Sequence, residues 1–139
     1  MTRAFVADAS VAVGWVHPAQ ATDQTAAMLD ALADGATLEV PALWTLEVAN
    51  ALIVLVRRRK LNDDERQTGL AWLRGLPLRI DPEAASLAFS RLSELAAAHR
   101  LSVYDAAYLE LAQRRKLALA CTDGPLRGAA KHAGVSLWE

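Results

Sequence analysis

Short apolar segments alternate with helix-like segments along the whole chain, and this alternation constrains the fold more than any other feature. We expect strands at the apolar segments 4–7, 38–40, 78–80, 117–121 and 135–137. Apolar spacing and capping signals predict helices over 9–16, 19–33, 42–56, 62–74, 82–99, 102–116 and 126–132. Asp81 is the expected N-cap of the helix over 82–99. Strands separated by helices pair in parallel, so an α/β fold with helices on both faces of a mainly parallel sheet is predicted.

The segment 42–56 has one charged residue among fifteen, Glu47. An apolar run of this length without glycine or proline predicts a helix that is buried on most sides, although it is too short to span a membrane. An ionised carboxylate in such a place loses its hydration at a cost on the order of several kcal/mol. Glu47 is therefore expected to have a basic partner, a metal ion or a strongly raised pKa. Two simpler explanations stay open: a long-range ion pair with an arginine, or a helix face that touches water.

Three other acids, Asp8, Asp105 and Asp123, are candidates for a shared site with Glu47, and each also has a local structural explanation. Asp8 and Asp123 each follow a predicted strand, and parallel α/β sheets bind ligands at the carboxyl ends of their strands. Each acid also has a local explanation: Asp8 as a helix cap, Asp105 as part of a capping box, and Asp123 as a turn residue. If these acids gather with Glu47, their repulsion is expected to be relieved by a divalent cation with oxygen ligands, Mg²⁺ or Mn²⁺.

Composition and motifs exclude several other classes of protein. The net charge of −1 excludes a protein that binds nucleic acid through bulk positive charge, so any such contact must come from local patches. The chain has no glycine-rich phosphate-binding loop, and its three histidines lack the spacing of a zinc site. The single cysteine, Cys121, permits no internal disulfide, and residues 1–18 lack the features of a signal peptide. A cytoplasmic protein without a membrane span is therefore expected.

These residues occur in a pattern that resembles a known family. The pattern consists of Asp8-Ala9-Ser10, Glu47-Val48-Ala49-Asn50, Tyr104-Asp105-Ala106-Ala107-Tyr108-Leu109-Glu110-Leu111-Ala112 and Thr122-Asp123. In this order and at these separations the chain resembles PIN-domain ribonucleases, in particular the VapC toxins of bacterial toxin–antitoxin pairs. The resemblance covers essentially the whole chain, so residues 1–139 are expected to form a single PIN-like domain. It implies a three-layer α/β/α fold with a sheet of about five strands, and Mg²⁺- or Mn²⁺-dependent endonucleolytic cleavage of RNA.

The resemblance also implies roles for particular residues. By position, the acids that would hold the ion and carry out catalysis are Asp8, Glu47, Asp105 and Asp123. Asp8 and Asp105 would be direct ligands, and the other two would act directly or through water. The side chains expected to lie behind the acids and hold them in place are Ser10, Asn50 and Thr122. One departure is Cys121, which stands where the family often has threonine, so Thr122 is left to supply the hydroxyl.

Two basic clusters are candidates for contact with RNA. They are Arg57, Arg58, Arg59 and Lys60, and Arg114, Arg115 and Lys116. Each cluster ends a predicted helix, where cations interact favourably with the helix dipole, and this is a sufficient local reason for both. The alternative is that one of them holds the phosphate backbone, and the 57–60 cluster is retained as the candidate RNA-binding surface.

The partners implied by the resemblance are an RNA substrate, a second copy of the chain in a homodimer, and a VapB-type antitoxin. Such an antitoxin lays a C-terminal segment across the active-site side. Two alternatives stay open: a PIN-fold nuclease of RNA processing or decay, and a non-enzymatic interaction module. A phosphotransferase with Asp8 as nucleophile is disfavoured, because Ser10 stands where that class requires a second aspartate.

Overall fold

Four short strands form a parallel sheet at the centre of the computed structural model, which describes residues 3–138. The strands are β1 (Ala4–Ala7), β2 (Thr37–Pro41), β3 (Leu78–Asp81) and β4 (Leu119–Ala120), in the order β3-β2-β1-β4. β1 and β2 occupy the middle of the sheet and are almost fully buried, which explains why most of their residues are apolar; Glu39 of β2 is a buried exception. Residues 1–2 and 139 of the predicted domain lie outside the described residues.

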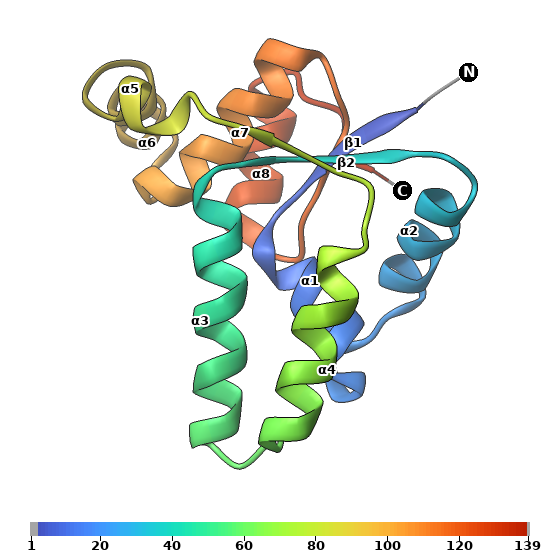
Figure 1. Cartoon of the computed structure of the whole chain (residues 1–139). Helices are drawn as coiled ribbons and strands as arrows, with labels where there is room; N and C mark the ends of the chain where they lie inside the picture. Colours follow the sequence, from blue (N-terminus) through green and yellow to red (C-terminus); the bar gives the residue numbers. More distant parts are fainter. Residues whose placement is uncertain (1–2, 139) are drawn as a thin grey trace.

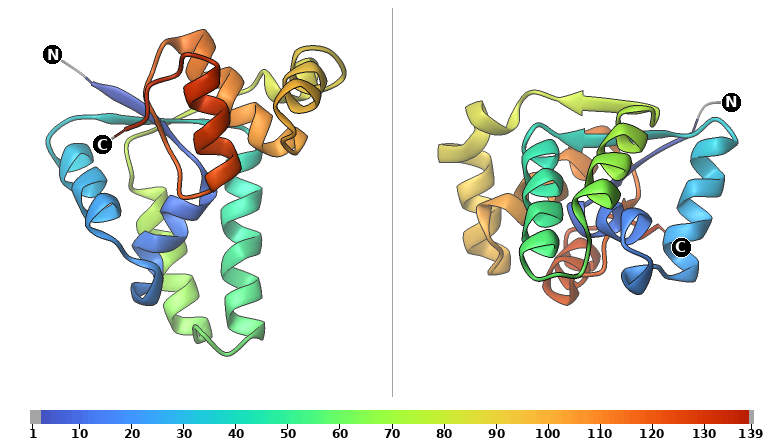
Figure 2. Two further views of the ribbon diagram at one scale, coloured as in Figure 1. Left: turned by 180° about the vertical axis from the view of Figure 1, so that it is seen from behind. Right: turned by 60° about the horizontal axis from the view of Figure 1, so that its bottom comes forward.

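Helices cover both faces of this sheet (Figure 1). The helices are α1 (Ala9–Val16), α2 (Asp23–Ala33), α3 (Leu43–Arg57), α4 (Asp63–Arg74), α5 (Ala84–Leu87), α6 (Ser93–His99), α7 (Val103–Arg115) and α8 (Gly124–His132), with a 3₁₀ turn over Pro18–Gln20 and a π turn over Ala88–Leu92. α1, α3 and α4 lie on one side of the sheet, and α7 and α8 lie on the other (Figure 2). The predicted three-layer α/β/α fold is therefore confirmed.

The predicted fifth strand at 135–137 is wrong. Within residues 3–138, this segment contributes a single parallel bridge, between Leu137 and Leu119 of β4. β4 itself is only two residues long. The amide of Leu117 donates to the carbonyl of Ala112 at 3.0 Å, so the start of the predicted strand is used to close the end of α7. Because β4 has only two residues, the segment after α8 can form no longer run of strand pairing with it.

The helix predicted over 82–99 begins later than expected. Asp81, its predicted N-cap, is the last residue of β3, and the helix begins at Ala84 with Glu83 as its N-cap. The Asp81 carboxylate receives two hydrogen bonds from Arg114 of α7, at 3.0 and 2.7 Å, and a longer one from the amide of Glu83 at 3.2 Å. The ion pair ties the edge of the sheet to α7, and this tertiary contact outweighs the local capping signal.

α3 and α4 form a helical hairpin that extends away from the sheet (Figure 1). α3 buries a single stripe of side chains, Trp44, Val48, Leu52 and Leu55. Leu46, on another face, is 74% exposed. The prediction that this helix is buried on most sides is therefore wrong, because it packs on α1 and α4 and its outer face is left open by the described part of the chain. No helix within residues 3–138 is long and apolar enough to cross a membrane.

Candidate active site

The acids predicted to share a site come from separate elements and lie at the carboxyl edge of the sheet. Asp8 directly follows β1, and Asp123 lies between β4 and α8. Asp105 is in the first turn of α7, and Glu47 lies early in α3, which follows β2. β2 and β3 are added on one side of β1, and β4 is added on the other side. The strand order therefore reverses at β1, beside Asp8. Open parallel sheets bind ligands at such a switch point.

The pKa values of two of these acids indicate that the carboxylates are close together. The pKa of Asp8 is raised to about 6, mainly by burial and further by the negative charges of Asp105 and Asp123. The pKa of Asp105 is raised by burial, and then by the charges of Asp123 and Glu47. Among residues 3–138, no basic side chain lies within 4.0 Å of any of these acids. The structure thus brings the acids into one cluster of uncompensated charge.

Local roles account for only part of this cluster. Asp123 caps α8, since its Oδ2 accepts a hydrogen bond from the amide of Leu126 at 2.9 Å. Ser102 caps α7 by accepting from the amide of Asp105 at 3.0 Å, whereas the Asp105 carboxylate makes no hydrogen bond with any described residue. Asp8 occupies the N-cap position of α1, where the amide of Val11 lowers its pKa, yet within residues 3–138 its side chain makes no capping hydrogen bond. Asp8 and Asp105 therefore keep carboxylate oxygens available for a ligand.

Two hydroxyls behind Asp8 form a directed chain of hydrogen bonds. Ser10 Oγ donates to Oδ1 of Asp8 at 2.5 Å and lies 2.9 Å from Oγ1 of Thr122. Because a serine hydroxyl has a single proton, Thr122 is the donor in the second bond. Thr122 thus supplies a hydroxyl beside Cys121, whose thiol is fully buried and whose pKa is raised to about 12, first by that burial. The thiol stays protonated and is a poor metal ligand.

The partner of Glu47 among the described residues is a neutral hydroxyl and not a base. The hydroxyl of Tyr108 donates to Oε1 of Glu47 at 2.5 Å. Burial, followed by this hydrogen bond, raises the pKa of the Tyr108 phenol. Glu47 itself is only half-buried. Sequence reasoning assigned no role to Tyr108, although its position three residues after Asp105 puts both side chains on one face of α7.

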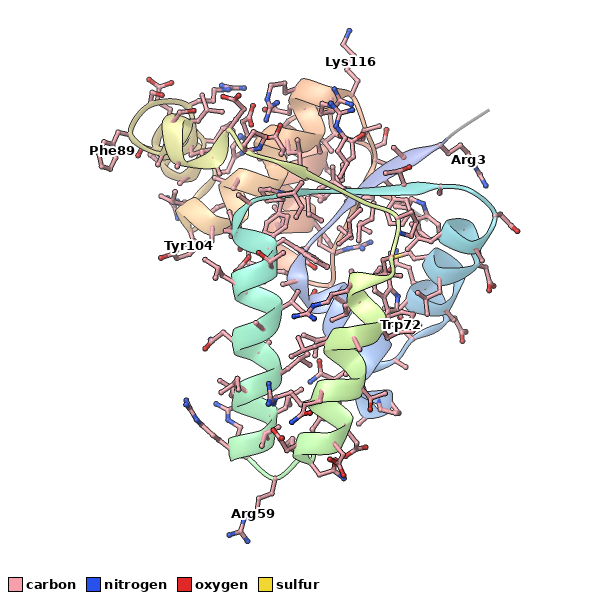
Figure 3. The ribbon with its side chains drawn as sticks, in the orientation of Figure 1. Arg3, Arg59, Trp72, Phe89, Tyr104 and Lys116 are labelled. Atoms are coloured by element: carbon pink, nitrogen blue, oxygen red, sulfur yellow. The ribbon has the colours of Figure 1, made fainter. Side chains whose placement is uncertain are left out.

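The 57–60 cluster lies far from the acids along α3, and Asn50 has no hydrogen-bond partner among the described residues that would tie it to them. Asn50 is exposed on α3 and makes no side-chain hydrogen bond within residues 3–138. Arg59 lies at the tip of the α3–α4 hairpin (Figure 3). α3 rises about 15 Å between Glu47 and Arg57, at about 1.5 Å per residue. The 57–60 cluster therefore lies well beyond the reach of a phosphate group held at the acids.

Two members of the second basic cluster, Arg114 and Arg115, are engaged in structural ion pairs. Arg114 contacts Asp81 at 2.7 Å and Glu110 at 2.9 Å, and Arg115 contacts Glu39 of β2 at 2.9 Å. These pairs hold the C-terminal end of α7 on the sheet. Neither guanidinium is free to bind a phosphate without breaking them.

The donor set of the cluster fits a hard divalent cation, because carboxylate and hydroxyl oxygens are the ligands that Mg²⁺ and Mn²⁺ prefer. Within residues 3–138, no group of three or more histidine, cysteine, aspartate or glutamate side chains is already placed to hold an ion. Mg²⁺ commonly takes one or two carboxylates and completes its coordination with water and substrate phosphate. Two carboxylates such as those of Asp8 and Asp105 would meet this requirement.

A groove of about 380 Å³ lies beside the cluster, between α1 and α3. Ser10 and Glu47 border it where it meets the acids, and Val13, Val54 and Leu55 contribute apolar walls. The site therefore has room next to the carboxylates for a group much larger than a metal ion.

The sheet order, the layers and the acids at the switch point define an α/β protein with an acidic site at the carboxyl edge of a parallel sheet. The chain belongs to the PIN domain family, whose model matches residues 5–131. The resemblance to PIN domains is thereby confirmed. In sequence, no curated protein matches the chain.

Solved structures share this fold over nearly the whole chain. One is the structure of VapBC2 from Rickettsia felis bound to a DNA fragment from the promoter of VapBC2. It matches with a TM-score of 0.68 and 14% sequence identity, and the match covers 97% of this chain and 97% of that chain. FitAcB from Neisseria gonorrhoeae has a TM-score of 0.61 at 18% identity, covering 100% and 97%. PAE2754 from Pyrobaculum aerophilum has a TM-score of 0.61 at 19% identity, covering 93% and 87%. At these identities the likeness establishes the fold alone.

Proposed function

We propose that this protein is an endoribonuclease that uses Mg²⁺ or Mn²⁺ to hydrolyse phosphodiester bonds in RNA, and that it is the VapC-type toxin of a toxin–antitoxin pair. The observation that carries the proposal is the cluster of Asp8, Glu47, Asp105 and Asp123, which has no basic partner among residues 3–138. Membership of the PIN domain family supports it, as does the fold shared with VapBC2 and FitAcB. We also propose that residues 1–139 form one domain.

The proposed mechanism gives each side chain a separate task. Asp8 and Asp105 would hold the ion, and Glu47 and Asp123 would contact it directly or through water. A bound Mg²⁺ or Mn²⁺ supplies Lewis-acid polarisation of the phosphate and lowers the pKa of a coordinated water. The carboxylates orient the attacking water in line with the leaving oxygen. Ser10 directs its proton to Asp8 and so keeps that carboxylate turned into the site. The supporting role of Asn50 stays a prediction.

Metal removal tests the chemistry of the proposal. Purified protein incubated with single-stranded or looped RNA and Mn²⁺ is expected to cut it, and excess EDTA is expected to stop cleavage. Restoring free Mn²⁺ should restore the cut ends, which shows that the chelator did not unfold the protein. Cleavage that persists at full rate in EDTA would contradict the proposal, because the described site offers no other source of an activated water.

The toxin role is tested in cells. Expression of the protein is expected to arrest growth, and co-expression of an antitoxin encoded beside it is expected to relieve the arrest. Asp105→Asn is the control, since it should abolish the arrest together with the cleavage. If an active enzyme is tolerated without arrest, RNA processing or decay is the better function. The proposed site of action is the cytoplasm, as the single cysteine suggests.

A homodimer is part of the proposal, and exposed apolar side chains support it. Leu46 of α3, Phe89 of the π turn and Tyr104 of α7 are 74%, 101% and 63% exposed. Leu46 and Tyr104 line an apolar groove of about 290 Å³ between α3, α5 and α7, and Phe89 projects on the same side of the molecule as Tyr104 (Figure 3). Exposed apolar side chains gathered on one side of a protein mark interaction surfaces. Sedimentation of the protein, with Phe89→Ser as the comparison, is expected to show a dimer that this variant weakens.

The candidate RNA-binding surface of Arg57, Arg58, Arg59 and Lys60 gives a separate prediction. Replacing all of them with serine is expected to weaken RNA binding and to reduce the slope of log affinity against log salt by about 0.7 for each phosphate that the variant no longer neutralises. The rate at saturating RNA should not change, because the cluster lies at the tip of the hairpin. Fluorescence anisotropy in Ca²⁺, over a series of salt concentrations, measures the slope. An unchanged slope would remove this cluster from the RNA footprint.

A further inference from the structure

Tyr108 lies against the acidic cluster as a fixed hydrogen-bond donor. Its ring is 1% exposed, and α7 carries it one turn after Asp105. Its hydroxyl has one hydrogen-bond partner within residues 3–138, Oε1 of Glu47. The negative charges of Asp8 and Asp105 also act on the phenol, so the hydroxyl is near three of the cluster's carboxylates. Since close packing holds a buried ring in one place, the oxygen is a rigid point beside a flexible acid.

Glu47 needs a fixed hydrogen-bond donor more than the three aspartates of the cluster do. A glutamate has one more rotatable bond than an aspartate, and ordering it costs more conformational entropy. Glu47 is half-buried in α3, the helix that extends away from the sheet, and water is an alternative partner for its carboxylate. Among residues 3–138 no basic group lies within 4.0 Å of it, and the phenol is the one hydrogen-bond donor that it contacts.

We infer that Tyr108 is a positioning residue that holds the Glu47 carboxylate toward Asp8 and Asp105 and thereby strengthens the binding of the divalent cation. The hydrogen bond occupies Oε1 and leaves Oε2 for the ion or for a water in its coordination shell. Because its ring is buried, Tyr108 acts through Glu47 and not by contact with RNA. The inference rests on the proposed function and adds a residue to it.

The test compares Mn²⁺ affinity in variants that keep the aromatic ring. Tyr108→Phe removes the donor and is expected to weaken Mn²⁺ binding about 10-fold by titration calorimetry, as the loss of an outer partner of a metal ligand does. Tyr104→Phe is the matched control, because it removes the same atom from the same helix at a side chain that is 63% exposed, and it keeps the ring that lines the apolar groove. Its affinity should equal that of the wild type. Far-ultraviolet circular dichroism confirms that each variant is folded.

A double-mutant cycle shows whether Tyr108 acts through Glu47. In the Glu47→Gln background, Tyr108→Phe is expected to change Mn²⁺ affinity by less than about 2-fold, because the group that it positions is already lost. A full 10-fold loss in that background would overturn the inference, and so would a Tyr108→Phe protein that binds Mn²⁺ as tightly as the wild type. A wild-type protein that binds no Mn²⁺ would overturn the proposed function itself, and the inference with it.

Discussion

Asp105→Asn is expected to reduce the rate of RNA cleavage at saturating Mn²⁺ by at least about 100-fold, because it removes a charge that stabilises the ion and the transition state. The substitution keeps the shape of the side chain. It also keeps the cap of α7, since Ser102 accepts from the main-chain amide of residue 105 and not from its carboxylate. The loss would therefore report on charge and not on folding. Single-turnover cleavage of an end-labelled RNA measures it.

Asp63→Asn is the matched control for this experiment. Asp63 is an exposed acid in the first turn of α4, where it pairs with Arg66 at 2.8 Å, outside the cluster. The same atoms change in both variants, so a general effect of acid-to-amide substitution would appear in both. Asp63→Asn should cut at close to the wild-type rate. If Asp105→Asn cuts as fast as this control, Asp105 does not belong to the catalytic set.

Asp8→Asn is expected to make the metal-free protein more stable at pH 7.5. The pKa of Asp8 is raised from 3.8 to about 6 in the folded protein. Ionising it therefore opposes folding by up to about 3 kcal/mol above pH 6. The folded state binds this proton more tightly than the unfolded chain does, so the wild type gains stability as pH falls from about 6 to about 4 and loses it as pH rises through about 6. Asparagine has no such titration and still accepts the hydrogen bond from Ser10.

Urea unfolding in EDTA, at pH 7.5 and at pH 5, measures this effect. The stability advantage of Asp8→Asn should be largest at pH 7.5 and should shrink at pH 5. Added Mn²⁺ is expected to reverse the order, because an ion that binds only the folded wild type stabilises it by mass action. A variant that is less stable than the wild type at pH 7.5 without metal would show that the Asp8 carboxylate is a structural hydrogen-bond acceptor first.

The layers of the fold were predictable because alternating apolar segments leave few ways to bury them. The number of strands was not predictable. The first residues of the predicted strand close the end of α7 and do not join β4, and their apolar character does not distinguish between these two roles. The prediction that Asp81 caps the following helix was wrong for a related reason. Its capping signal is local, whereas the arginine that takes its carboxylate lies 33 residues further along the chain.

The positions of the acids relative to the sheet could be predicted from the sequence, but the surroundings of the acids could not. Spacing relative to strands placed Asp8 and Asp123 at one edge of the sheet. It did not show that the side chain of Asp123 caps a helix while that of Asp8 does not. The surroundings of Glu47 depend on how far α3 extends beyond the sheet, and on a tyrosine 61 residues away. Both are properties of tertiary packing, so the apolar helix suggested deeper burial than Glu47 has.

The two ends of the acidic cluster come from opposite ends of the chain. The amide of Asp8 donates to the carbonyl of Ala120 at 3.1 Å, and the hydroxyls of Ser10 and Thr122 meet across 112 residues. β4 must pair with β1 before these side chains can meet, and β4 is the last of the strands to be synthesised. On the proposed function, Thr122 and Asp123 therefore join the other site residues only after most of the chain has been synthesised.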